Sequence, residues 1–221
     1  MWKNLQRNLY DLFFPPDCLI CGATDGLLCG DCRSLMEVSG FHARSRLKHL
    51  VDVYSAVRYK NRFAKKMIRA FKYEPFSRQL KTALASLVID HFLMLDKPFD
   101  FSGRILVPVP LAAGRLRWRG YNQAQELAEE LAKSWRLELA ACLRRTKETK
   151  IQTTLSAAQR KTNIKGSRSC FGPTLIRGKQ ILLIDDVIPT GTTMEECARV
   201  LLKGGAASVT GISVAHAEID D

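Results

Sequence analysis

Short apolar runs alternate along the chain with longer segments whose apolar residues recur every three or four positions. The short runs predict four strands, at residues 51–58, 105–109, 180–185 and 209–216. The helical spacing predicts four helices, at residues 63–73, 77–95, 121–135 and 193–204. Strands that alternate with helices indicate an α/β fold with a parallel sheet flanked by helices.

The boundaries of these elements follow from local residue chemistry. Pro75 should end the helix before it, and Ser77 should cap the helix after it. Residues 137–143 fit a helix or a strand, and the alternation of strands and helices along the chain favours a strand. Residues 146–166 are polar and irregular.

The N-terminal segment predicts an amphipathic helix over residues 1–14. Its apolar side chains at helical spacing are Trp2, Leu5, Leu9, Leu12 and Phe13. Such a helix packs on its own protein or lies on a membrane surface, and packing is the expectation. The segment lacks the apolar core and cleavage site of a signal peptide, and no stretch is long and apolar enough to span a membrane. We therefore expect a cytoplasmic protein.

Four of the seven cysteines fall within fifteen residues, as two Cys-x-x-Cys pairs: Cys18, Cys21, Cys29 and Cys32. Each pair can supply half of a tetrahedral shell of sulfur ligands, so we predict a structural Zn²⁺ site in a module over residues 15–40. Two local disulfides, a redox pair and chance are the alternatives. The isolated Cys142, Cys170 and Cys197 are expected to be small buried apolar residues.

The chain carries 34 basic and 22 acidic residues, a formal net charge of +12. The excess lies in the middle of the chain, and residues 58–81 contain nine basic residues and one acid. Lys65, Lys66, Arg69 and Lys72 are expected mostly on the face opposite the apolar stripe of their helix. A solvated helix face would explain this pattern, but its density favours a polyanionic partner or a phosphorylated ligand.

Two acids follow a buried strand near the C-terminal end of the sequence. Asp185 and Asp186 come after four apolar residues, and a turn rich in threonine and glycine then opens a helix. Ligands of α/β sheets bind beyond the carboxyl ends of the strands, and amide groups at a helix N-terminus bind anions. The pattern predicts a phosphate cradle beside carboxylates that suit ribose hydroxyls or a metal-bound sugar phosphate.

Three arginines alternate at Arg115, Arg117 and Arg119, before the hydrogen-bonding side chains of Asn122 and Gln123. This segment suits a pyrophosphate or a nucleic-acid backbone, and a surface arginine loop is the alternative. A third stretch, from Arg145 to Phe171, is polar and basic, and we expect it to form a mobile lid over a sugar phosphate.

The acidic strand end and its turn resemble the 5-phosphoribosyl 1-pyrophosphate (PRPP) motif of type I phosphoribosyltransferases. The resemblance implies that Asp185 and Asp186 contact the ribose hydroxyls. It also implies a loop that holds the 5-phosphate, formed by Thr190, Gly191, Thr192 and Thr193. Pro189 stands where that family usually has a small residue, and it removes one backbone donor from the turn.

The order of motifs along nearly the whole chain resembles the ComF family. This order is the double Cys-x-x-Cys, Pro-Val-Pro, Arg-x-Arg-Gly-Tyr-Asn-Gln-Ala, the Gln-x-x-Leu to Arg-x-x-Asn-x-x-Gly segment, and the PRPP motif. The resemblance implies a zinc-ribbon-like module followed by a type I phosphoribosyltransferase-like domain over residues 51–221. It also implies PRPP binding with Mg²⁺, and a role in DNA uptake during competence or in DNA and nucleotide metabolism.

Three kinds of function are compatible with this resemblance. The first is a phosphoribosyltransferase, with Asp185, Asp186, Arg115, Arg117 and Arg119 as the catalytic residues. The second is a protein that senses PRPP or handles DNA without turnover. In both of these interpretations, residues 58–81 and 115–119 are the expected contacts for single-stranded DNA. The third is an adaptor whose zinc module holds a partner, such as another competence protein.

Overall fold

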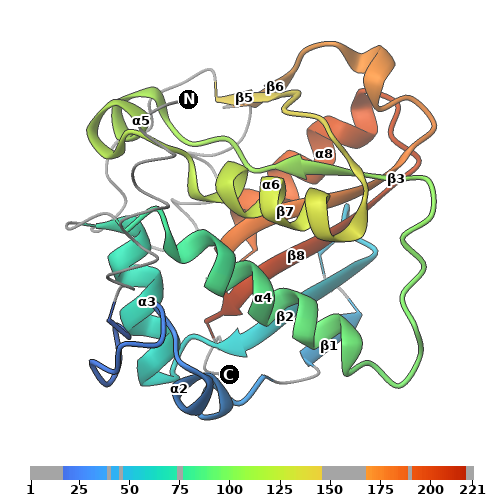
Figure 1. The fold of residues 1–221 in the computed structure, drawn as a ribbon. Helices are drawn as coiled ribbons and strands as arrows, with labels where there is room; N and C mark the ends of the chain where they lie inside the picture. Colours follow the sequence, from blue (N-terminus) through green and yellow to red (C-terminus); the bar gives the residue numbers. More distant parts are fainter. Residues whose placement is uncertain are drawn as a thin grey trace.

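The computed structural model describes residues 17–38, 41–44, 47–73, 77–145, 168–188 and 191–217 (Figure 1). A six-stranded sheet runs through the molecule in the order β1-β2-β8-β7-β3-β4. Its strands are β1 (Phe41–Arg44), β2 (Asp52–Arg58), β3 (Arg104–Pro108), β4 (Glu138–Leu139), β7 (Gln180–Ile188) and β8 (Ser208–His216). β1 pairs antiparallel with β2, and all other neighbours are parallel. The predicted α/β fold with a parallel sheet is confirmed.

The second sheet is a small antiparallel ribbon of β5 (Leu143–Arg145) and β6 (Arg168–Cys170). The α-helices are α2 (Gly30–Ser34), α3 (Arg62–Lys72), α4 (Leu80–Leu93), α5 (Ala113–Arg119), α6 (Gln123–Trp135) and α8 (Thr192–Lys203). A short 3₁₀ helix, η2, covers Pro173–Leu175. Among the described residues, no helix combines the length and apolar content needed to cross a membrane.

The sheet separates two apolar clusters, which explains why its strands are apolar on both faces. Along β7, Leu182 and Ile184 pack in the cluster that includes side chains of α3, α4 and α6. The alternate residues Ile181 and Leu183 pack in the cluster that includes side chains of α8. Successive side chains of a strand point to opposite faces, so a strand covered on both sides reads as one apolar run.

β8 lies in the centre of the sheet, between β2 and β7. The β2–β8 pairing joins residues far apart in the sequence: Ser55 lies opposite Ser213, and their buried Oγ atoms are 2.7 Å apart. The last described strand of the chain, β8, therefore joins the N-terminal pair of strands, β1 and β2, to the rest of the sheet.

The cysteine module packs against the core of the main sheet. Met36, which follows α2, is fully buried in the same cluster as α3 and α4. Arg33 on α2 donates to Asp90 on α4, with an Nε–Oδ2 distance of 3.0 Å. The Asn61 side chain caps α3 by accepting from the amides of Phe63 and Ala64, and its Nδ2 donates to the carbonyls of Leu35 and Met36. One residue thus fastens the start of α3 to the module.

Several expected boundaries are wrong in detail. The arginine segment, for which no helix was predicted, forms the short helix α5, which Gly120 ends with a left-handed φ of 80°. α6 begins at Gln123 instead of residue 121, because Asn122 accepts from the amide of Ala124 as its cap. α4 begins at Leu80, and Ser77 contributes its carbonyl to that start instead of a side-chain cap.

Other expectations have mixed outcomes. Residues 137–143 contain only the two-residue β4 before β5 begins. Cys142 and Cys197 are buried as expected, whereas Cys170 is half-buried. The predicted helix at 1–14 and the polar stretch 146–166 lie outside the described residues.

Candidate functional site

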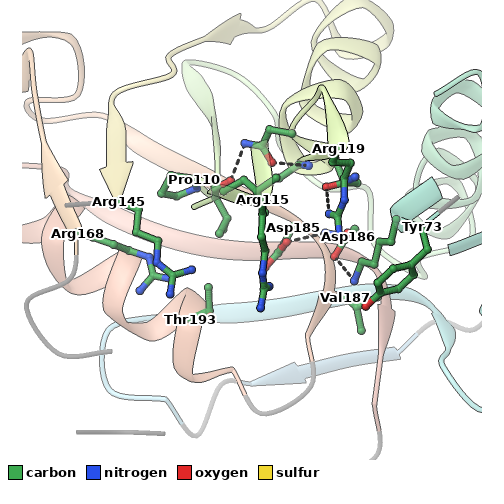
Figure 2. A pocket seen from close by; sticks show the side chains of 16 residues that line it. Tyr73, Pro110, Arg115, Arg119, Arg145, Arg168, Asp185, Asp186, Val187 and Thr193 are labelled. Atoms are coloured by element: carbon green, nitrogen blue, oxygen red, sulfur yellow. Dashed lines mark hydrogen bonds and ion pairs between the residues drawn. The ribbon is translucent and has the colours of Figure 1, made fainter. Parts of the chain in front are cut away.

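A cavity of about 260 Å³ opens at the carboxyl edge of β3 and β7. These two strands are parallel neighbours, so their ends meet at the same edge of the sheet. The cavity is lined by five cations and two carboxylates: Lys72, Arg115, Arg119, Arg145, Arg168, Asp185 and Asp186. Figure 2 shows Arg145 and Arg168 extending toward Thr193, with Arg119, Asp186 and Tyr73 grouped at the other side. This excess of positive charge suits a ligand with several phosphate groups.

The two acids differ in their surroundings although they are adjacent in β7. The amide of Asp186 donates to Oδ1 of Asp185 at 2.9 Å, and Oδ1 of Asp186 lies 2.8 Å from Nζ of Lys72. Burial, with the neighbouring charge of Asp186, raises the pKa of Asp185 to about 7. Burial alone would lower the pKa of Lys72, but the attraction of Asp186 and Asp185 outweighs it and holds that pKa above its usual value. Near neutral pH, Lys72 is therefore charged while Asp185 is close to its titration midpoint.

Lys72 is a site residue that sequence reasoning missed. It was grouped with the cations on the solvated face of α3, and that placement is wrong for Lys72, although Lys65, Lys66 and Arg69 are exposed. A signal was present in the sequence. Lys72 lies four residues after the buried Ile68, so it continues the inward stripe of the helix.

The N-terminus of α8 contributes the turn expected to hold a phosphate. Gly191, the residue before the helix, has a φ of 70°, and a Cβ added there would lie 2.5 Å from Cδ1 of Leu47. His49 fastens the segment of Leu47 to α8, because its Nδ1 lies 2.6 Å from Oε1 of Glu195. Thr193 lines the cavity, whereas Thr192 is half-buried and is not among the lining residues. Thr190 and Pro189 lie outside the described residues.

The structure divides the three arginines of α5. Arg119 is buried at the cavity, bonds to the side-chain oxygen of Gln123 and lies 5.7 Å from the ring centre of Tyr73. Burial lowers the pKa of Arg119. Arg115 lines the cavity but is largely exposed, and Arg117 is exposed and not among the lining residues. Two of the three therefore lie at the acid pair's cavity.

The residues that follow these arginines make hydrogen bonds to the main chain around the cavity. Tyr121 Oη and Gln123 Nε2 both donate to the carbonyl of Phe71, at 2.7 and 3.1 Å. Asn122 donates to the carbonyl of Val109 at 3.0 Å while it caps α6. The amides that the sequence suggested for ligand binding thus make internal hydrogen bonds, which fix the end of α3 and the start of α6.

Two cavity cations, Arg145 and Arg168, come from the β5–β6 ribbon. Arg145 stands at the start of the stretch expected to be a lid, and Arg168 was not singled out in the sequence. The two residues are paired across the ribbon, at the two ends of a segment that lies outside the described residues.

The four clustered cysteines form a second centre, in residues 17–38. All four Sγ atoms lie within 4.8 Å of one another, and those of Cys21 and Cys29 are 3.6 Å apart. Four sulfurs at 2.3 Å from a tetrahedral Zn²⁺ would be separated by about 3.8 Å. All four cysteines are free thiols. The donor set fits one structural zinc ion.

Two family models match the chain. A model described as a phosphoribosyl transferase domain matches residues 118–219, which include Arg119, Asp185 and Asp186. A model described as a double zinc ribbon domain matches residues 9–42, which include the four clustered cysteines.

The chain is also similar to several named bacterial proteins. "Competence protein ComFC" of Bacillus subtilis is 31% identical over 202 residues, covering 89% of this chain and 76% of that protein. "DNA utilization protein YhgH" of Salmonella typhimurium is 35% identical over 137 residues, covering 59% of this chain and 58% of that protein. "Competence protein F" of Haemophilus influenzae is 34% identical and covers 51% of this chain and 50% of that protein. The chain thus spans about half the length of several curated relatives that it matches.

Among solved structures, glutamine PRPP amidotransferase from B. subtilis is similar with a TM-score of 0.42 and 16% identity. That similarity covers 65% of this chain and 30% of the other.

Proposed function

The chain belongs to the ComF family, and from that membership we propose that it binds PRPP at the carboxyl edge of β3 and β7 and acts in the uptake or use of DNA. One observation carries the proposal of PRPP as ligand. An adjacent pair of carboxylates faces a cavity that five cations and the N-terminus of a helix surround. Sugar hydroxyls need acceptors, and phosphates need cations and amide donors.

Each part of PRPP has a matching set of residues in this proposal. The ribose hydroxyls donate to Asp185 and Asp186. The 5-phosphate binds at the turn of Thr190, Gly191, Thr192 and Thr193, with Arg145 and Arg168 close to Thr193 (Figure 2). The pyrophosphate binds toward α5, where Arg115 and Arg119 supply positive charge.

Carboxylate oxygens are suitable ligands for Mg²⁺, and the acid pair supplies them, but one oxygen of Asp186 is already paired with Lys72. The residues therefore fit a Mg²⁺ held mainly by oxygens of the ligand. When bound, this ion supplies positive charge to the pyrophosphate. In a transferase, Arg115 and Arg119 would stabilise the departing pyrophosphate, and the cavity would orient the sugar toward an acceptor. A protein without turnover would use the same contacts for binding alone.

A second surface favours single-stranded DNA as a partner. The outer face of α3 exposes Arg62, Lys65, Lys66 and Arg69. Beside the cavity, the half-exposed rings of Tyr73 and Trp118 have centres 6.2 Å apart, and Arg117 lies next to Trp118. Cations that follow a backbone and rings on which bases stack are the features of single-strand binding. We propose that DNA contacts residues 58–81 and 115–119, in agreement with the names of the YhgH relatives.

Calorimetry with PRPP and Mg²⁺ tests the ligand assignment. The wild-type protein should bind PRPP at one site, and Asp186→Ala should lose that binding without losing its fold. Asp96→Ala, which removes an exposed acid after α4, is the matched control and should bind as the wild type does. Absence of binding by the wild type, or equal binding by Asp186→Ala, would overturn the proposal.

A further inference from the structure

A short segment that neither family model covers lies against the start of α8. Residues 47–51 stand between the two matched regions of the chain. At its end the segment is attached to β8, because the amide of Val51 donates to the carbonyl of Val209 at 2.9 Å. Leu50 is buried in the same apolar cluster as Met194 of α8. The segment is therefore held by both the sheet and the helix.

His49 joins this segment to α8 through a single carboxylate. The main-chain amide of His49 donates to Oε2 of Glu195 at 3.2 Å, and Nδ1 of His49 lies 2.6 Å from Oε1. A carboxylate accepts hydrogen bonds, so Nδ1 carries the proton in this pair. The side chains are 26% and 22% exposed, so water competes with the contact only in part. The two residues are 146 positions apart in the sequence, and their contact fixes two distant segments to each other.

The carboxylate that His49 contacts belongs to the first turn of α8, which the phosphate turn opens. The amide of Glu195 donates to the carbonyl of Gly191 at 2.8 Å. Gly191 has a φ of 70°, and Leu47 occupies the space where a Cβ would stand. A glycine has many alternative backbone conformations, so contacts from outside the turn are needed to select this one. Leu47 and His49 supply such contacts.

We propose that His49 is a positioning residue for the phosphate turn: its contact with Glu195 holds residues 47–49 against the start of α8, so that the turn is formed before PRPP arrives. This inference rests on the proposed PRPP site. A turn that is ordered in the free protein binds its phosphate without the entropy cost of ordering, whereas a loose turn loses affinity to that cost.

The first test needs no ligand and compares two replacements of the same shape, His49→Asn and His49→Leu. The side-chain amide of asparagine has an N–H where His49 has Nδ1, leucine has no donor, and neither is charged. Hydrogen exchange followed by NMR should be about tenfold faster at the Glu195 amide in His49→Leu than in His49→Asn. The amide of Gly204, which donates to Val200 at the other end of α8, should exchange equally in both.

Two results of this experiment would overturn the proposal. Equal exchange of the Glu195 amide in the two variants would mean that the side chain of His49 does not hold the turn. Equally faster exchange at Gly204 would mean that the whole helix is destabilised, which is a structural role with no preference for the turn.

The second test measures PRPP affinity by calorimetry with Mg²⁺. His49→Leu should bind about three- to tenfold more weakly than His49→Asn, and equal affinities would overturn the proposal. In a Glu195→Ala background the acceptor is absent, so the two replacements should bind PRPP equally. This comparison cancels the effect of the lost charge of Glu195, which both proteins share. A difference that persists in this background would mean that residue 49 acts on the ligand directly, which overturns positioning through Glu195.

Thermal unfolding verifies that each variant is folded, and His49→Ala replaces His49→Leu if the latter is not. Failure of the proposed function is a separate outcome. A wild-type protein that binds no PRPP refutes the ligand, while exchange of the Glu195 amide still decides whether His49 holds the turn.

Discussion

Gly191, at the start of α8, provides a quantitative test of the phosphate turn. Its φ of 70° would cost an alanine roughly 1–2 kcal/mol in the left-handed region. The new Cβ would also lie 2.5 Å from Cδ1 of Leu47, so the leucine would have to move about 1 Å, at a cost of about 1 kcal/mol for a strained rotamer. Gly191→Ala should therefore lower the free energy of unfolding by about 2–3 kcal/mol.

Two variants separate these contributions. Gly103 has a φ of 67° with no atom within 4 Å of an added Cβ, so Gly103→Ala should show the backbone cost alone. In a Leu47→Ala background, the cost of Gly191→Ala should fall to the same value, because the clash is removed.

Urea unfolding, followed by tryptophan fluorescence, measures all four proteins and the wild type. A cost of Gly191→Ala that is unchanged by Leu47→Ala would refute the close packing of Leu47 on the turn. A cost below that of Gly103→Ala would refute the left-handed conformation of Gly191.

Three further predictions address the other parts of the molecule. Cys18→Ser should lose the stoichiometric zinc that native mass spectrometry detects, whereas Cys170→Ser, outside the cluster, should retain it. The pKa of Asp185 is raised to about 7 in the folded protein, so between about pH 4 and 7 the native protein binds more protons than the unfolded chain. Asp185 therefore destabilises the folded protein increasingly as pH rises through that window. Asp185→Asn should therefore raise Tm more at pH 8 than at pH 5, and an equal effect at both would contradict the raised pKa. Arg117→Ala should weaken single-stranded DNA binding and reduce the slope of log affinity against log salt concentration by about one. Trp118→Ala should weaken binding without changing that slope, because it removes base stacking and no charge. An unchanged affinity in both variants would show that α5 is not part of the DNA surface.

The features that sequence reasoning predicted well are local. The apolar run of β7 is visible because a strand covered on both faces buries successive side chains, and the spacing of Cys18 to Cys32 already favoured one centre of four sulfurs. Asp185 and Asp186 are adjacent in the sequence, so their place at a strand end follows from that strand.

The features that it missed depend on contacts between distant segments. Lys72 and Arg168 reach the cavity from α3 and β6, and no spacing within either segment indicates that they meet Asp186 or Asp185. The amides of Asn122 and Gln123 were read as ligand-binding groups because their partners, the carbonyls of Val109 and Phe71, are main-chain atoms that leave no trace in the sequence.

The central place of β8 also constrains how the protein is made. β2 can pair in parallel only after β8 has been synthesised, and Ser55 and Ser213 are 158 residues apart. At typical translation rates of about 5–20 residues per second, roughly 8–30 seconds pass between the synthesis of β2 and the synthesis of its partner β8. During that interval the apolar side chains of β2 are not yet covered by β8. We therefore expect chaperones to bind the nascent chain. A message cut short before β8 would yield a polypeptide with its sheet split in two, which cellular proteases should remove.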